Sequence, residues 1–182
     1  KQILNYIIDE CSLEYAITIS KTHGNDVILF REESININLE YDFDYLCHDN
    51  KMVFKNYKFV IIDGMIESVG EIHHLLYEAS QNKEPYIIFC FGVSQEVKNT
   101  ILENNKRGIT KVYPVDITFK EDTINILNDI ALVHNADIVT ANKGQTISQA
   151  IKKSLPYGKE IILTKNKIII EKLCSDTALK QH

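Results

Sequence analysis

The chain has 182 residues, of which 45% are hydrophobic and 25% are charged, and its formal net charge is -5 at pH 7. These values are ordinary for a globular domain, and a negative chain without a basic block excludes nucleic acid as its main partner. No apolar stretch approaches the roughly 20 residues that cross a bilayer, so we predict no membrane partner. The 4 cysteines are far apart and form no CxxC pair, which favours a reducing compartment and a cytoplasmic protein.

The first part of the chain predicts short elements before the main unit. Apolar residues over positions 1–23 have the spacing of one or two amphipathic helical turns. Residues 26–31 predict a strand, and 35–39 predict a half-buried strand because their apolar residues alternate with period two. A turn at 49–51 and a short strand at 52–54 follow.

Residues 57–115 predict the unit around which the rest is organised, which is a strand, helix, strand, helix and strand. Its first strand, 58–63, is an unbroken apolar run, as in a parallel strand covered on both faces. Apolar residues then recur every three or four positions from Ile66 to Ala79, which predicts a helix that ends before Pro85.

The second half of this unit follows the same plan. Residues 86–91 predict another buried strand, and Ser94 is placed to cap the next helix. Gly108 ends that helix, and 109–115 supply the third strand. Two right-handed crossovers are the economical way to connect these pieces into a parallel core.

The remainder predicts a helix, a strand and a hairpin. Asp122 is placed to cap a helix that extends to Val133, and a strand follows at 137–141. A short helix near 147–151 precedes two strands, 160–164 and 167–171, which indicate a hairpin. Antiparallel strands around a parallel core predict an α/β fold with a mixed sheet in one domain.

Motifs for catalysis or cofactor binding do not emerge from the sequence. Asp63-Gly64 follows a strand, but a single glycine is not a GxGxxG phosphate cradle. His73 and His74 are adjacent and point about 100° apart on a helix, so they do not easily share a metal ion. We therefore predict no catalytic, cofactor-binding or metal-binding residues. A small enzyme that acts at the strand ends, near Asp63, Gly92 and Asp116, ranks last among the functional hypotheses.

The two crossover helices offer a surface instead. If Ile72, Leu75 and Ala79 pack inward, the stripe with His73, Leu76 and Tyr77 turns partly outward. Four residues of the next helix are in register with it, namely Lys98, Ile101, Leu102 and Asn105. A groove between these helices would accept an extended or amphipathic peptide. The alternative is that these apolar residues complete the core and nothing docks there.

A family resemblance appears in the central unit. Its positions match the apical domain of group I (GroEL-like) chaperonins at Asp63, Ile66, Pro85, Asn104, Arg107-Gly108-Ile109 and Lys111-Val112. The pattern runs without a gap over 59–112 and continues to 162. The stretch 24–46 is similar to the part where the family chain enters that domain. The resemblance implies an apical-domain-like fold with a central β-α-β-α-β unit flanked by antiparallel strands.

The resemblance also implies a domain division for the chain. Residues 24–172 would be the core of one apical-like domain that covers 1–182, and 1–23 would be a helix leading in from a neighbouring domain. Because the chain lacks an initial methionine and starts directly in a possible helix, we expect a piece of a longer chaperonin chain.

In function, the resemblance implies capture of non-native polypeptide, and of a co-chaperonin loop, between the two helices. The polypeptide-binding positions that it carries over are Tyr45, Leu46, His73, Leu76, Lys98, Leu102, Glu103 and Asn104. His73, Lys98 and Glu103 stand where the family prefers aliphatic residues, so we expect a more polar groove here.

The rest of the family machinery would lie outside this segment. The resemblance implies a homo-oligomeric ring driven by ATP and Mg²⁺, which an equatorial domain without counterpart in this sequence would bind. The segment itself would then be no enzyme. A hypothesis of another class is a stand-alone binding module with the apical fold, dedicated to one partner.

Overall fold

The computed structural model describes residues 34–46, 50–120, 123–140, 146–152 and 154–171. All of them belong to one of the chain's two compact units, Glu32–His182. The helix predicted at the start of the chain and the strand predicted at 26–31 lie outside the described residues. The division of the chain into domains stays a prediction.

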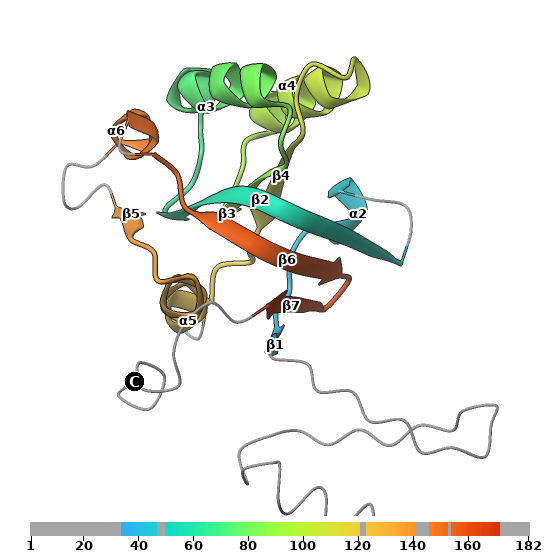
Figure 1. The fold of residues 1–182 in the computed structure, drawn as a ribbon, viewed down its shortest axis with the longest axis vertical. Helices are drawn as coiled ribbons and strands as arrows, with labels where there is room; N and C mark the ends of the chain where they lie inside the picture. Colours follow the sequence, from blue (N-terminus) through green and yellow to red (C-terminus); the bar gives the residue numbers. More distant parts are fainter. Residues whose placement is uncertain (1–33, 47–49, 121–122, 141–145, 153, 172–182) are drawn as a thin grey trace, which may run out of the picture. The chain divides into compact units, whose positions relative to one another are not determined.

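The described residues form a mixed sheet with helices on both faces (Figure 1). The 7-stranded sheet has the order β1-β7-β6-β2-β3-β4, and β5 pairs with β2. Its strands are β1 Ser34–Asn38, β2 Lys51–Asp63, β3 Tyr86–Cys90, β4 Val112–Asp116, β5 Ile138–Thr140, β6 Tyr157–Thr164 and β7 Lys167–Glu171. The helices are α2 Phe43–Leu46, α3 Val69–Asn82, α4 Gln95–Lys106, α5 Thr123–His134 and α6 Ile147–Lys152.

The central β-α-β-α-β unit is confirmed as a parallel core. β2 pairs with β3 and β3 with β4, all parallel, while α3 and α4 make the two connections. Side chains of β2 alternate between the two faces, so Phe59 and Ile61 join one buried cluster and Val60 and Ile62 the other. This double burial explains the unbroken apolar run in the sequence.

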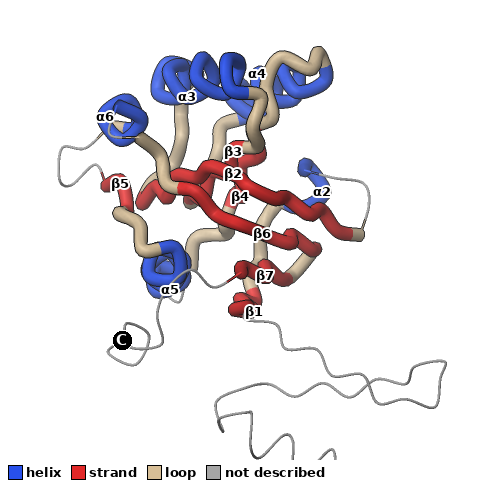
Figure 2. Tube along the Cα trace, in the orientation of Figure 1, coloured by secondary structure: helices blue, strands red, loops and turns tan. Residues whose placement is uncertain are grey.

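Two layers of helices cover the sheet (Figure 2). α3 and α4 lie on one face, with α6 packed beside α3. α5 covers the other face, where its Leu127 and Ile130 pack with Phe59 and Phe89. The short helix α2 buries Phe43 in this same cluster, at the end of the sheet toward β4.

β2 corrects one sequence prediction. Strands were predicted separately at 52–54 and 58–63, but the structure has one strand of 13 residues. Lys55 and Asn56 interrupt the apolar pattern, and their side chains are exposed. The backbone pairing with β6 nevertheless continues on both sides of Asn56. Backbone pairing of this kind does not depend on side-chain type.

The same strand has a divided edge. Lys51 to Lys58 pair with β6, whereas Ile61 to Asp63 pair with β5 in the opposite sense. The predicted hairpin is confirmed as β6 and β7, with β6 beginning at Tyr157. The antiparallel strands therefore flank the parallel core on the β6 side, as a mixed sheet requires.

The ends of α4 are those that the sequence predicts. The Ser94 side chain accepts a hydrogen bond of 3.4 Å from the Val97 amide, which caps the first turn. Gly108 follows the helix with φ of 67°, a left-handed conformation that glycine adopts without strain. These two residues set the length of the helix that carries half of the candidate site.

Candidate functional site

The residues predicted to bind polypeptide lie on three helices. α2 carries two of them, α3 carries two and α4 carries the other four, namely Tyr45, Leu46, His73, Leu76, Lys98, Leu102, Glu103 and Asn104. Their contacts differ, so the structure separates residues that reach solvent from residues that hold the helices in place.

On α3, the predicted division between inward and outward faces is confirmed. Ile72, Leu75 and Ala79 are fully buried in the cluster between this helix and the sheet. Leu76 is only half-buried and packs at the edge of that cluster, while His73 is exposed. Leu76 therefore serves the core as well as any partner.

On α4, the predicted residues are divided between two flanks. A helix turns by about 100° per residue, so the directions of Leu102 and Asn104 differ by about 160°. Lys98 and Leu102, four positions apart, share one flank. Glu103 is exposed and pairs with Arg107, Nε to Oε1, at 2.8 Å. The four residues therefore do not line a single groove with α3.

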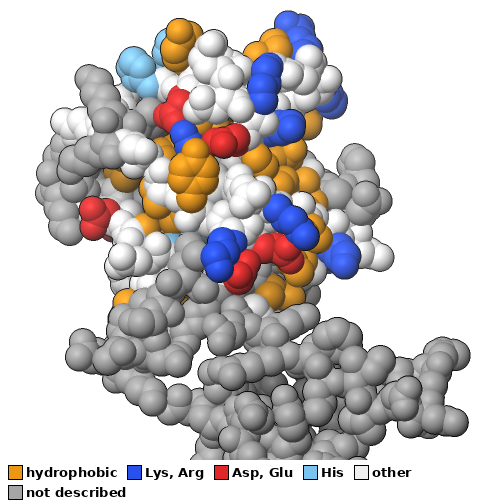
Figure 3. Space-filling model, viewed as in Figure 1, with side chains coloured by type: hydrophobic (Ala, Val, Ile, Leu, Met, Phe, Trp, Pro, Cys, Tyr) orange, Lys and Arg blue, Asp and Glu red, His pale blue; other side chains and the backbone are white. Residues whose placement is uncertain are grey.

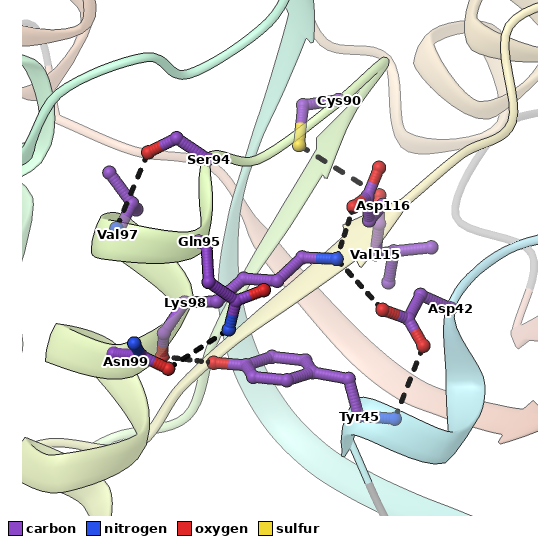
Figure 4. Close-up of polar contacts among 10 residues, drawn as sticks. All are labelled: Asp42, Tyr45, Cys90, Ser94, Gln95, Val97, Lys98, Asn99, Val115 and Asp116. Atoms are coloured by element: carbon purple, nitrogen blue, oxygen red, sulfur yellow. Dashed lines mark hydrogen bonds and ion pairs between the residues drawn. The ribbon is translucent and has the colours of Figure 1, made fainter.

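Lys98 lies at the centre of a cluster of polar contacts (Figure 4). Its Nζ is 2.7 Å from an Oδ2 atom of Asp42 and 2.7 Å from that of Asp116. Only 12% of its side chain is exposed. Lys98 therefore does not face solvent, and Glu103 on the same helix pairs with Arg107 instead.

Tyr45 completes this cluster from α2. Its hydroxyl donates a hydrogen bond of 2.7 Å to the carbonyl oxygen of Lys98, and its ring centroid is 5.4 Å from the Lys98 ammonium. Its amide in turn donates to the Asp42 carboxylate at 3.3 Å. Figure 4 shows that α2, α4 and the end of β4 meet at these side chains.

The two carboxylates of the cluster favour the charged form of Lys98. Burial alone would lower the pKa of Lys98, but hydrogen bonds and charge from Asp116 and Asp42 outweigh it and raise that pKa. Burial raises the pKa of Tyr45 to about 12, so its hydroxyl stays a neutral donor. The cluster is thus a hydrogen-bonded ion triad at neutral pH.

Backbone contacts reinforce the attachment of α2. The Asp42 amide donates to the Asp116 carbonyl oxygen at 3.2 Å, and Tyr41 forms a bridge with Ile117. The sequence holds no local signal for this attachment, because Asp42 and Lys98 are 56 positions apart. Sequence analysis therefore missed Asp42 altogether.

Ile101 and Asn105 also depart from the sequence analysis, which placed them in register with the groove. Ile101 is fully buried, and Asn105 has contacts of its own. Its amide nitrogen donates to the Val112 carbonyl oxygen at 2.7 Å, and its Oδ1 accepts from the Val112 amide at 3.1 Å. The side chain therefore turns toward β4 and ties the end of α4 to that strand.

Residues at and near the strand ends have contacts within the fold. The Asp116 carboxylate is engaged by Lys98, and Met65 lies over Gly92. Cys90 is buried, which raises the pKa of its thiol to about 12, so it is no nucleophile at neutral pH. Within the described part of the chain, no three His, Cys, Asp or Glu side chains gather as a metal site requires.

Apolar groups near α3 and α4 are dispersed among polar ones. Tyr77 is 64% exposed and Ile109, just after α4, is 39% exposed. Figure 3 shows histidine, hydrophobic and basic side chains next to one another over these helices. A cavity of about 840 Å³ lies elsewhere, between β5, α6 and the middle of β2, and none of the eight predicted residues lines it.

Comparison with known proteins gives chaperonins. Chaperonin GroEL 1 of Prochlorococcus marinus (strain MIT 9312) is 24% identical over 172 residues, which is 92% of this chain and 30% of the relative. The chloroplastic RuBisCO large subunit-binding protein subunit beta of Pisum sativum is 23% identical over 82% of this chain and 26% of its own length. The chloroplastic RuBisCO large subunit-binding protein subunit alpha of Chlamydomonas reinhardtii is 20% identical over 87% of this chain and 28% of its own length.

These relatives confirm the resemblance that the sequence analysis describes. The chain is similar to chaperonins over most of its length, as a divergent GroEL-like apical domain would be, and its mixed sheet has the expected fold class. It spans less than a third of the length of these three relatives. No family model matches the chain. In the described residues, no helix has the length and apolar character to cross a membrane.

Proposed function

We propose that this chain captures non-native polypeptide as the apical-like part of a chaperonin, through the surface formed by α2, α3 and α4. The similarity to chaperonins supports this proposal, together with the position of the apolar side chains on these helices. Relatives named RuBisCO large subunit-binding proteins carry a protein partner in their names, which agrees with a polypeptide ligand.

The observation that carries the proposal is the incomplete burial of apolar groups on α3 and α4. Leu76 and Leu102 are half-buried, and Tyr77 and Ile109 are exposed. An unfolded chain that covered these groups would release water from apolar surface, which stabilises the complex by about 1.5–3 kcal/mol per fully buried side chain. The polar residues between them make the surface less apolar than a continuous groove.

The wider machine is part of the same proposal. The full-length protein would form a homo-oligomeric ring that binds ATP and Mg²⁺ in a domain outside this segment. A co-chaperonin loop would compete for the same surface, and the cytoplasm stays the predicted compartment. Two of the relatives are chloroplast proteins, so the similarity does not single out one compartment.

Binding to an unfolded protein tests the proposal. A chemically unfolded, fluorescently labelled protein is titrated with this chain, beside the same labelled protein in its native form. We expect binding to the unfolded form only. Leu102→Glu should abolish it, because a carboxylate would replace an apolar contact at the surface.

A matched variant controls for the added charge. Asn125→Glu introduces the same charge at an exposed position of α5, on the opposite face of the sheet, and should bind like the original chain. Failure of the original chain to bind either form would overturn the capture function. Equal loss in both variants would show that net charge, and not the surface, controls binding.

A further inference from the structure

We infer that Lys98 is a positioning residue, which fixes α2 and its Tyr45 against α4 within the proposed binding surface. The inference rests on the proposed function and assigns a new role to a residue that the family resemblance implies as a contact to polypeptide. It also names two partners, Asp42 and Asp116, that no sequence pattern indicates.

The geometry of the ammonium group is the first argument. A lysine that bound a ligand by its charge would direct Nζ to solvent. Here Nζ lies 2.7 Å from each of two carboxylates, and the side chain is 12% exposed. The positive charge is therefore paired with carboxylates of the same chain and is not available to a docked polypeptide.

The origin of the three charges is the second argument. Asp42 immediately precedes α2, Lys98 lies on α4 and Asp116 ends β4. The ion triad thus joins α2 to two elements that follow much later in the sequence, α4 and β4. Removal of one partner from a partly buried ion pair of this kind costs much more stability than removal of one partner from an exposed pair.

The position of Tyr45 is the third argument, because its two polar contacts are hydrogen bonds to Lys98 and Asp42. Its hydroxyl is bonded to the Lys98 carbonyl oxygen and its amide to the Asp42 carboxylate. Without the ammonium, Asp42 and Asp116 would repel each other, and α2 would move away from α4. The aromatic part of the surface would then lose its fixed place.

Lys98→Met tests this role, since it removes the charge and keeps an unbranched side chain. We expect the dissociation constant for the labelled unfolded protein to rise about tenfold or more, as expected when one important contact group is lost. Hydrogen exchange at the amides of Asp42 and Tyr45 should become faster. Lys98→Arg keeps the charge and should restore both readouts toward the original values.

Lys58→Met is the matched control for lost stability. Lys58 is also a largely buried lysine, with 10% of its side chain exposed and Nζ 2.7 Å from Oε1 of Glu78. It joins β2 to α3 and does not touch α2. We expect this variant to be destabilised, with the exchange at α2 and the affinity for unfolded protein close to the original.

The outcomes separate the two proposals. Original affinity in Lys98→Met, or equal losses in Lys98→Met and Lys58→Met, would overturn the positioning role while leaving polypeptide capture intact. No binding by the original chain would overturn the capture function and, with it, the binding role of Lys98. Unchanged exchange at α2 in Lys98→Met would contradict the inference whatever the affinity.

Discussion

The Tyr45 hydroxyl and the Lys98 carbonyl oxygen are joined by a hydrogen bond of 2.7 Å that spans 53 positions of sequence. Because a carbonyl on the side of a helix is already an acceptor within that helix, this bond uses its second lone pair. α2 is thereby attached to the backbone of α4 as well as to its side chains.

Tyr45→Phe should remove this bond and keep the ring in place. We expect the free energy of unfolding to fall by about 1 kcal/mol, the usual net value of a hydrogen bond. Urea denaturation followed by circular dichroism measures it. Tyr77→Phe is the control, because Tyr77 is 64% exposed on α3, and its stability should be unchanged. Equal stability of both variants would mean that the Tyr45 bond contributes nothing.

His134 should make the stability of the fold depend on pH. Its Nδ1 donates to the Ile130 carbonyl oxygen at 2.9 Å, so its Nε2 accepts from the Tyr57 hydroxyl at 2.6 Å. Burial lowers the pKa of His134 to about 4, below the unfolded value near 6.5. The unfolded chain therefore takes up this proton first, and stability is lost as pH falls from about 6.5 to 4.

The expected loss from this residue is about 3 kcal/mol between pH 7 and pH 4. Urea denaturation at several pH values measures it, and His134→Gln removes the titrating group. The difference between the two proteins isolates His134 from the carboxylates, which titrate in both. Parallel pH profiles would contradict a neutral, buried imidazole.

Gly158→Ala should damage the core next to this pair. A Cβ atom at Gly158 would lie 2.2 Å from Cζ of Tyr57, whose ring is fully buried. We expect a loss of 1–3 kcal/mol or more, as for other overpacked sites, measured by thermal unfolding. Gly64→Ala is the matched control, since nothing lies within 4 Å of its Cβ position. Adding Tyr57→Leu to Gly158→Ala should recover part of the stability.

The two leucines of the proposed surface should differ in their effect on stability. Leu76→Glu places a carboxylate at the edge of the cluster that holds Ile72 and Leu75, so it should be strongly destabilised. The stability of Leu102→Glu should stay close to that of the original chain, because Leu102 is not among the residues that pack on that cluster. Thermal unfolding of both variants checks this. Similar losses would mean that Leu102 is also part of the core.

The central unit could be predicted from the sequence because its signals are local. Apolar spacing on α3, the cap at Ser94 and the turn at Gly108 each depend on residues within a few positions of one another. Even burial on both faces of β2 and β3 follows from unbroken apolar runs. The family resemblance added the order of the elements, which local patterns do not contain.

The arrangement of the site could not be predicted in the same way. Lys98 looks like a surface residue of a helix because its two carboxylate partners lie 56 and 18 positions away. Helical periodicity gives the direction of a side chain from the axis, but not the element that it meets there. For the same reason the bond between Tyr57 and His134, 77 positions apart, had no signal in the sequence.

The divided edge of β2 has a consequence for synthesis of the chain. β2, β3 and β4 follow one another closely and can pair soon after they leave the ribosome. The first residues of β2 cannot pair at that stage, because the partner of Lys51 is Thr164, more than a hundred positions later. Until β6 has been made, this segment is an open strand edge, the kind of surface at which nascent chains associate wrongly. The protein would itself pass through a state that needs protection.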